Sequence, residues 1–192
     1  MSLRALVPWC LALLPPLAQA QAASAPAPGW NDVAPILVGR CAKCHVNGGL
    51  MGPAPEGYLL VSHADALSAT DRARVVPGNP AASELIRRVK GQSLPRMPFD
   101  GPPWLSAEEI DLLERWIAQG ARDANGQPQP VPVGARVRLQ GHLGADGRLD
   151  GLPLMSGGRM RVDKAPQPGD RVEVRGSLDA QGQVLVERLR RR

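Results

Sequence analysis

The residues best suited to chemistry in this sequence form the run Cys41-Ala42-Lys43-Cys44-His45. Its C-x-x-C-H spacing is that of a covalent haem attachment site. Two thiols three positions apart on a helical turn lie on one side of it, where both can bond the vinyl groups of one haem. The next imidazole can then ligate the iron. The run therefore predicts one covalently bound haem c, with Cys41 and Cys44 as attachment points and His45 as an iron ligand.

Three other interpretations of the run are a dithiol redox pair, half of a zinc site, and coincidence. A dithiol redox pair usually occurs beside a βαβ pattern, which is absent here. A closed zinc site needs four nitrogen or sulfur ligands. The only other histidines are His63 and His142, and there is no second cysteine pair. The sequence therefore favours haem.

The first twenty residues have the features of a secretory signal peptide. Arg4 supplies a positive start, an apolar run extends from Leu6 to Leu17, and Ala18-Gln19-Ala20 forms an A-x-A cleavage site. An uncleaved anchor is the alternative, but the run is short and holds three prolines. We expect a periplasmic protein with no transmembrane anchor after cleavage. Cleavage also removes Cys10, so that haem attachment would use both remaining cysteines.

Composition divides the rest of the chain into four segments. Residues 21–29, rich in alanine and proline, are expected to be a disordered leader. Residues 30–126 show helical spacing and hold the haem motif. Residues 127–132 contain three prolines and are expected to be a linker. Residues 133–192 show strand-like alternation and turn residues, which predicts a small β module.

Helices are predicted wherever an N-capping residue precedes apolar residues at helical spacing. The clearest follows the capping box Ser106 to Glu109 and ends at Gly120. The others are expected after Asn31, reaching about Lys43; after Ser62, reaching about Ala69; and after Asn79, ending at Gly91.

A second axial ligand would complete the iron site, and methionine there gives an electron-transfer centre of raised potential. Met97 follows His45 by 52 residues and lies in a loop stiffened by Pro95 and Pro98. That placement suits a ligand that approaches the iron from the opposite face. His63 is the chief rival, because ligation by two histidines is chemically reasonable. Met51 is only six residues from His45, so the chain would have to turn around the haem edge almost at once for its sulfur to reach the iron.

The segment from Trp30 to Arg122 resembles a class I c-type cytochrome, in particular the planctomycete-type cytochrome c domain. The resemblance covers about half the chain. It implies an all-α cytochrome c-like haem domain in which Cys41 and Cys44 attach the haem while His45 and Met97 ligate the iron. The family often has Met-Pro-Pro where this chain has Met97-Pro98-Phe99. The matching blocks are Pro35-Ile36-Leu37, Arg40-Cys41, Val76-Pro77-Gly78, Ser83 to Val89, Arg96-Met97-Pro98 and Leu105 to Ala121.

The β module lies outside this resemblance. Alternation at 135–139, 171–175 and 183–187 predicts four to six short strands, with a five-stranded OB-like barrel as one arrangement. The net charge of +5 comes from residues 131–192, which hold 12 Lys and Arg against 7 Asp and Glu. The same residues include no Phe, Tyr or Trp on which bases could stack, which argues against nucleic-acid binding.

These features predict a mono-haem electron carrier rather than an enzyme. An iron with both axial positions filled has no site for a substrate and exchanges single electrons. The basic residues suggest docking to an acidic redox partner or to an anionic membrane surface, although a solvated basic face is an equal alternative. The alternative function is a haem enzyme or ligand sensor with a displaceable sixth ligand, in which the β module docks a partner.

Overall fold

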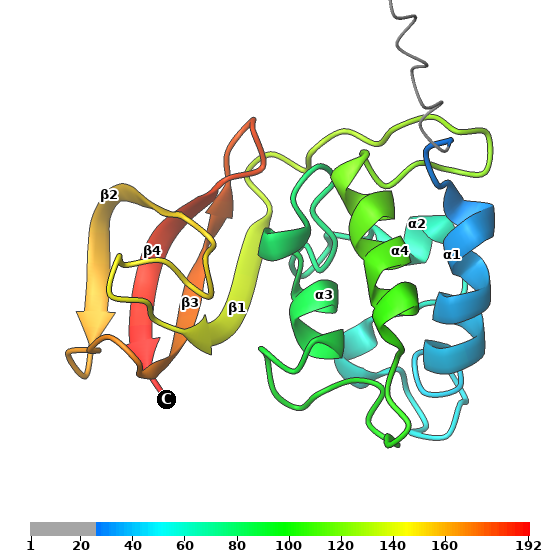
Figure 1. Ribbon diagram of the computed structural model, residues 1–192, viewed down its shortest axis with the longest axis horizontal. Coiled ribbons are helices and arrows are strands. Elements are labelled where there is room, and N and C mark those ends of the chain that lie inside the picture. Colours follow the sequence, from blue (N-terminus) through cyan, green and yellow to red (C-terminus); the bar gives the residue numbers. More distant parts are fainter. Residues whose placement is uncertain (1–25) are drawn as a thin grey trace, which may run out of the picture.

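The computed structural model describes residues 26–192, so the predicted signal peptide and Cys10 lie outside the described residues. Helices gather on one side of the molecule and a β-sheet lies on the other (Figure 1). The helices are α1 (Trp30–Ile36), α2 (His63–Ala66), α3 (Glu84–Val89) and α4 (Ala107–Ala118). The strands are β1 (Arg136–His142), β2 (Leu154–Asp163), β3 (Arg171–Leu178) and β4 (Val184–Arg191).

The predicted capping residues start three of the helical segments. Ser106 accepts a hydrogen bond from the backbone of Glu109, whose carboxylate accepts one from the Ser106 backbone, which completes a capping box at α4. Ser62 caps α2 through the backbone N–H of Asp65. The Asn79 side chain caps a 3₁₀ turn, Pro80–Ala82, that precedes α3.

The haem motif lies at the end of an irregular helix. α1 begins after Gly29 rather than after Asn31, and continues as a π-helix from Leu37 to Cys41. The backbone N–H groups of Cys44 and His45 both point back to the Cys41 carbonyl, at 3.1 and 2.9 Å. The motif is therefore wound as a tight turn, with its side chains on the inner side of the helix end.

The sheet has the strand order β1-β3-β4-β2. β1 pairs antiparallel with β3, and β3 pairs antiparallel with β4, whereas β2 runs parallel to β4. Strand alternation buries Val137 and Leu139 of β1 while the residues between them are more exposed. β2 was not predicted as a strand, because its Gly157-Gly158 pair breaks the alternation and coincides with a shift in register.

The predicted fold class, an all-α cytochrome c-like haem domain followed by a small all-β module with an OB-like barrel as one form, is wrong. The structure is mixed, with four α-helices of only 7, 4, 6 and 12 residues beside the sheet. Proline and glycine interrupt the chain between helices, most densely at 48–57 and 95–103, and leave it irregular. The sheet has four strands and is open, because its two edge strands, β1 and β2, do not pair with each other.

Residues from the helical part of the chain contribute to the core under the sheet. One apolar cluster lies among the helices and includes Val33, Leu113 and Trp116. The second lies under the sheet, but Ala73 and Val76 from the loop before α3 belong to it as well. Helix α3 contacts β1 (Figure 1). Within residues 26–192, none of the helices has the length and apolar composition needed to cross a bilayer.

Candidate functional site

A cavity of about 330 Å³ opens beside the C-terminal end of the π-helix. Its walls bring together all four residues predicted to bind haem, which come from two distant segments: Cys41, Cys44 and His45 from the motif, and Met97 from the loop after α3. The remaining wall is mainly apolar, as expected for a cofactor site. It includes Leu37, Tyr58, Leu60, Leu85, Val89, Pro98, Leu105 and Leu113.

The imidazole of His45 is held in a fixed orientation. Its Nδ1 lies 2.8 Å from the backbone carbonyl of Tyr58, so that Nδ1–H donates and Nε2 keeps a free lone pair. The Tyr58 hydroxyl in turn donates to the Ala66 carbonyl at 2.8 Å. A singly protonated imidazole with Nε2 available is the form that ligates a metal.

The two cysteines are free thiols, both partly exposed to solvent. Burial raises the pKa of the Cys41 thiol to about 11, against smaller opposing effects of Arg40 and Lys43. A redox-active dithiol requires a lowered pKa, because the thiolate is the nucleophile. Cys41 is therefore not activated as a nucleophile, and both cysteines line the cavity.

The two candidates for the second axial ligand occupy different places. Met97 lines the cavity, and its backbone N–H donates to the Arg88 carbonyl at the end of α3. His63 does not line the cavity. Its ring lies 5.5 Å from that of Trp30 and 6.2 Å from that of Trp116, and its Nε2 contacts the Ala121 carbonyl at 2.9 Å. Of these two, only Met97 is available to a group in the cavity; Met51, the third candidate, also lines it, six residues after His45.

Basic side chains lie on two sides of the cavity. Arg40 and Lys43 flank the cysteines, where Arg40 donates to the Pro103 carbonyl and Lys43 pairs with Asp100. On the opposite wall, Arg74 and Arg88 approach from the segments around α3. The Arg74 guanidinium stacks 4.6 Å from the centre of the Tyr58 ring. Sequence patterns gave no indication of these positions, because the chain brings them together only through its loops.

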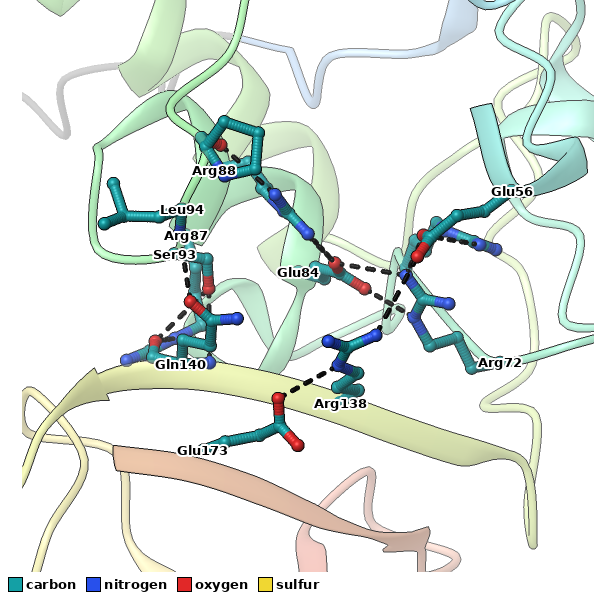
Figure 2. A network of polar contacts seen from close by, with 12 residues as sticks. Glu56, Arg72, Glu84, Arg87, Arg88, Ser93, Leu94, Arg138, Gln140 and Glu173 are labelled. Carbon is teal, nitrogen blue, oxygen red and sulfur yellow. Dashed lines mark hydrogen bonds and ion pairs between the residues drawn. The ribbon is translucent and has the colours of Figure 1, made fainter. Parts of the chain in front are cut away.

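An ion-pair network connects this wall with the sheet (Figure 2). Glu84, which is buried at the start of α3, accepts from Arg72 at 2.7 Å and from Arg88 at 2.9 Å. Arg72 also pairs with Glu56, which lies 3.8 Å from Arg138 of β1. Arg138 then donates to Glu173 of β3 at 3.1 Å. The network provides fixed charges between the cavity and the β module.

Comparisons with known proteins add no identification: no family model, curated protein or solved structure matches this chain. Among the described residues, 26–192, no three His, Cys, Asp or Glu side chains are grouped so as to hold a metal ion. The donor set at the cavity is instead two thiols, one oriented imidazole and the thioethers of Met97 and Met51, held in a mainly apolar wall. That set fits a covalently attached haem.

Proposed function

We propose that the protein is an exported mono-haem c-type cytochrome that carries single electrons in the periplasm. The observation that carries the proposal is the convergence of Cys41, Cys44, His45 and Met97 on one cavity, although 52 residues separate the histidine from the methionine. The resemblance of residues 30–122 to class I c-type cytochromes supports the same function.

Each residue has a defined task in this proposal. Cys41 and Cys44 attach the group through thioether bonds, His45 ligates the iron through Nε2, and Met97 ligates it through its sulfur. A haem bound in this way supplies a one-electron redox centre whose potential is raised by methionine ligation. Tyr58 fixes the imidazole through its carbonyl, which also makes the ligand more basic. The apolar wall excludes water and lowers the local dielectric constant.

The test is to express the full chain with its signal peptide in cells that attach haem to cytochromes c, and to purify it from the periplasm. We expect a covalent low-spin haem with the weak red band of a sulfur–iron bond. Met97→Ala should abolish that band, because it removes the only methionine sulfur assigned to the iron. His63→Ala is the matched control and should keep it, because His63 lies outside the cavity.

Other outcomes would change the assignment. Loss of the low-spin spectrum in His63→Ala but not in Met97→Ala would show that His63, and not Met97, is the second ligand of the iron. A high-spin spectrum of the unaltered protein, or one that changes with carbon monoxide, would show an accessible iron. The proposed function would then be that of a haem enzyme or sensor rather than an electron carrier. Absence of covalent haem from the purified protein would refute the proposal.

A further inference from the structure

A second hollow lies between the loop 94–104 and the sheet, next to the haem cavity. This open groove has a volume of about 760 Å³. The loop is fixed to β1 at this place, because the backbone N–H of Leu94 donates to the Gln140 side chain and Ser93 bonds the Gln140 backbone. The groove thus has one wall from each part of the molecule, and both are held in place.

The groove is strongly basic. Of the ten residues that line it, four are arginines and none is acidic: Arg96, Arg138, Arg171 and Arg192 are the four. Arg96 donates to the Val89 carbonyl and stacks 4.2 Å from the Trp104 ring centre, while Arg171 donates to the Gln92 carbonyl. Neither has a carboxylate partner among the described residues.

The other two arginines are only partly neutralised. Arg138 and Arg192 both pair with Glu173, which Arg175 also contacts. One buried carboxylate therefore serves three guanidinium groups, with Glu56 as a distant second partner of Arg138. A groove with this excess of positive charge attracts a negatively charged ligand.

Apolar side chains accompany the arginines. Leu94, Phe99 and Trp104 line the groove and are 50%, 68% and 38% exposed. Exposed aromatic residues next to arginine are the composition typical of protein-binding surfaces. Pro95 and Phe99 line the haem cavity as well as the groove. Anything seated in the groove would therefore lie beside the cavity.

We propose that this groove docks an acidic segment on the surface of the protein that exchanges electrons with this one. The inference rests on the proposed function, and it gives the β module a task, since β1 and β3 supply Arg138 and Arg171. A protein segment fits the site better than an anionic membrane, because exposed aromatic side chains beside arginine are typical of protein-binding surfaces. The arginines steer the acidic segment, and Phe99 and Trp104 pack against it.

The test measures binding of a fluorescein-labelled hexaglutamate peptide to the haem-loaded full chain by fluorescence anisotropy at low ionic strength. Arg96→Gln and Arg171→Gln should each weaken binding about three- to fivefold, the range expected for one partly exposed charge contact. Added salt should weaken binding to the unaltered protein. Arg171→Lys, which keeps the charge, should retain most of the affinity.

Arg159→Gln is the matched control, because Arg159 is exposed on the far edge strand β2 and makes no ion pair among the described residues. The proposal would be overturned in favour of diffuse attraction if Arg96→Gln and Arg171→Gln bound hexaglutamate as tightly as the unaltered protein. The same would follow if Arg159→Gln lost as much affinity as the two groove variants. Capture of the protein by phosphatidylglycerol vesicles without hexaglutamate binding would overturn it in favour of a membrane. The haem spectrum of the same preparations tests the proposed function separately.

Discussion

At the scale of single residues, Glu173 of β3 carries an unusual concentration of charge contacts. Its side chain is 2% exposed, and its carboxylate accepts from Arg138, Arg175 and Arg192. Burial by itself raises the pKa of this carboxyl, but the hydrogen bonds and charges of the three arginines outweigh it and lower the pKa from 4.5 to about 2. The folded protein therefore holds Glu173 ionised at pH values where the unfolded chain binds a proton.

This pKa shift predicts how stability depends on acid. A carboxyl whose pKa is depressed in the folded state stabilises the fold above its unfolded pKa, and that contribution is lost as the pH falls through the folded value. We expect the free energy of unfolding to decline between pH 4.5 and about 2, and to decline less steeply in Glu173→Gln. Urea denaturation at several pH values measures both slopes. Identical slopes would show that Glu173 is not responsible.

The orientation of the histidines belongs to the same scale and shows what the sequence could not predict. The spacing of Cys41, Cys44 and His45 predicted their convergence on one side of a turn. It could not predict Tyr58 as the partner of His45, because a backbone carbonyl carries no residue-type signature. The contact of the His63 ring with Trp30 and Trp116 was equally hidden, since it depends on how α1 and α4 pack.

At the scale of elements, α4 is the longest helix and the most regular. Its capping box satisfies two backbone N–H groups at the N-terminus, and its apolar residues Leu113, Trp116 and Ile117 are fully buried. The helix packs against α1 and α3 and contributes Leu113 to the cavity wall. Its N-terminus also follows directly after the loop that forms the groove.

Removal of the cap should cost stability without changing the core. We expect Ser106→Ala to lower the free energy of unfolding by about 1 kcal/mol, the usual value for loss of a serine N-cap. Urea denaturation measures the change. Ser68→Ala is the control, because Ser68 is an exposed residue whose hydroxyl hydrogen-bonds only Thr70 within residues 26–192, and it should change stability by less than about 0.5 kcal/mol.

Local chemistry explains which elements the sequence could predict. Ser62 and Ser106 cap helices where expected, and β1, β3 and β4 follow the alternating segments, because capping and alternation act within a few residues. The prediction of the fold class was wrong because the fold depends on contacts between residues distant in the sequence. The chain between helices adopts irregular structure that only its packing determines, and the parallel pairing of β2 with β4 depends on contacts beyond any local pattern.

At the scale of the whole molecule, an ion pair with a buried arginine joins the helices to the loop between β1 and β2. Arg87 of α3 is 1% exposed and contacts Asp150 at 2.5 Å, while its Nε donates to the Gln140 carbonyl of β1. A Cβ atom at Gly141 would lie 2.0 Å from the Asp150 carboxylate, so glycine leaves the space that the pair needs. The Pro-rich segment 127–132 is also held, since Gln129 donates to the Gly120 carbonyl.

Breaking this pair should destabilise both halves together. Asp150→Ala leaves a buried guanidinium without its counter-charge, and we expect a loss of about 3–5 kcal/mol. Thermal unfolding should remain a single transition at a lower temperature, because Ala73 and Val76 of the helical part belong to the core under the sheet. The double variant Arg87→Met/Asp150→Ala should be less destabilised than the single variant Asp150→Ala. Asp111→Ala, which removes an exposed helix pair with Arg115, is the control and should cost less than about 1 kcal/mol.

The position of α3 between the cavity and the sheet limits how this sequence can diverge. An ordinary surface helix has a face turned to water on which substitutions accumulate freely. In α3 five of the six residues are buried, including Glu84 and Arg87, while Leu85, Arg88 and Val89 line the cavity. Each position contributes to the cavity wall, to the ion-pair network or to the contact with the sheet. In descendants of this chain, the run Glu-Leu-Ile-Arg-Arg-Val should therefore change more slowly than the longer helix α4.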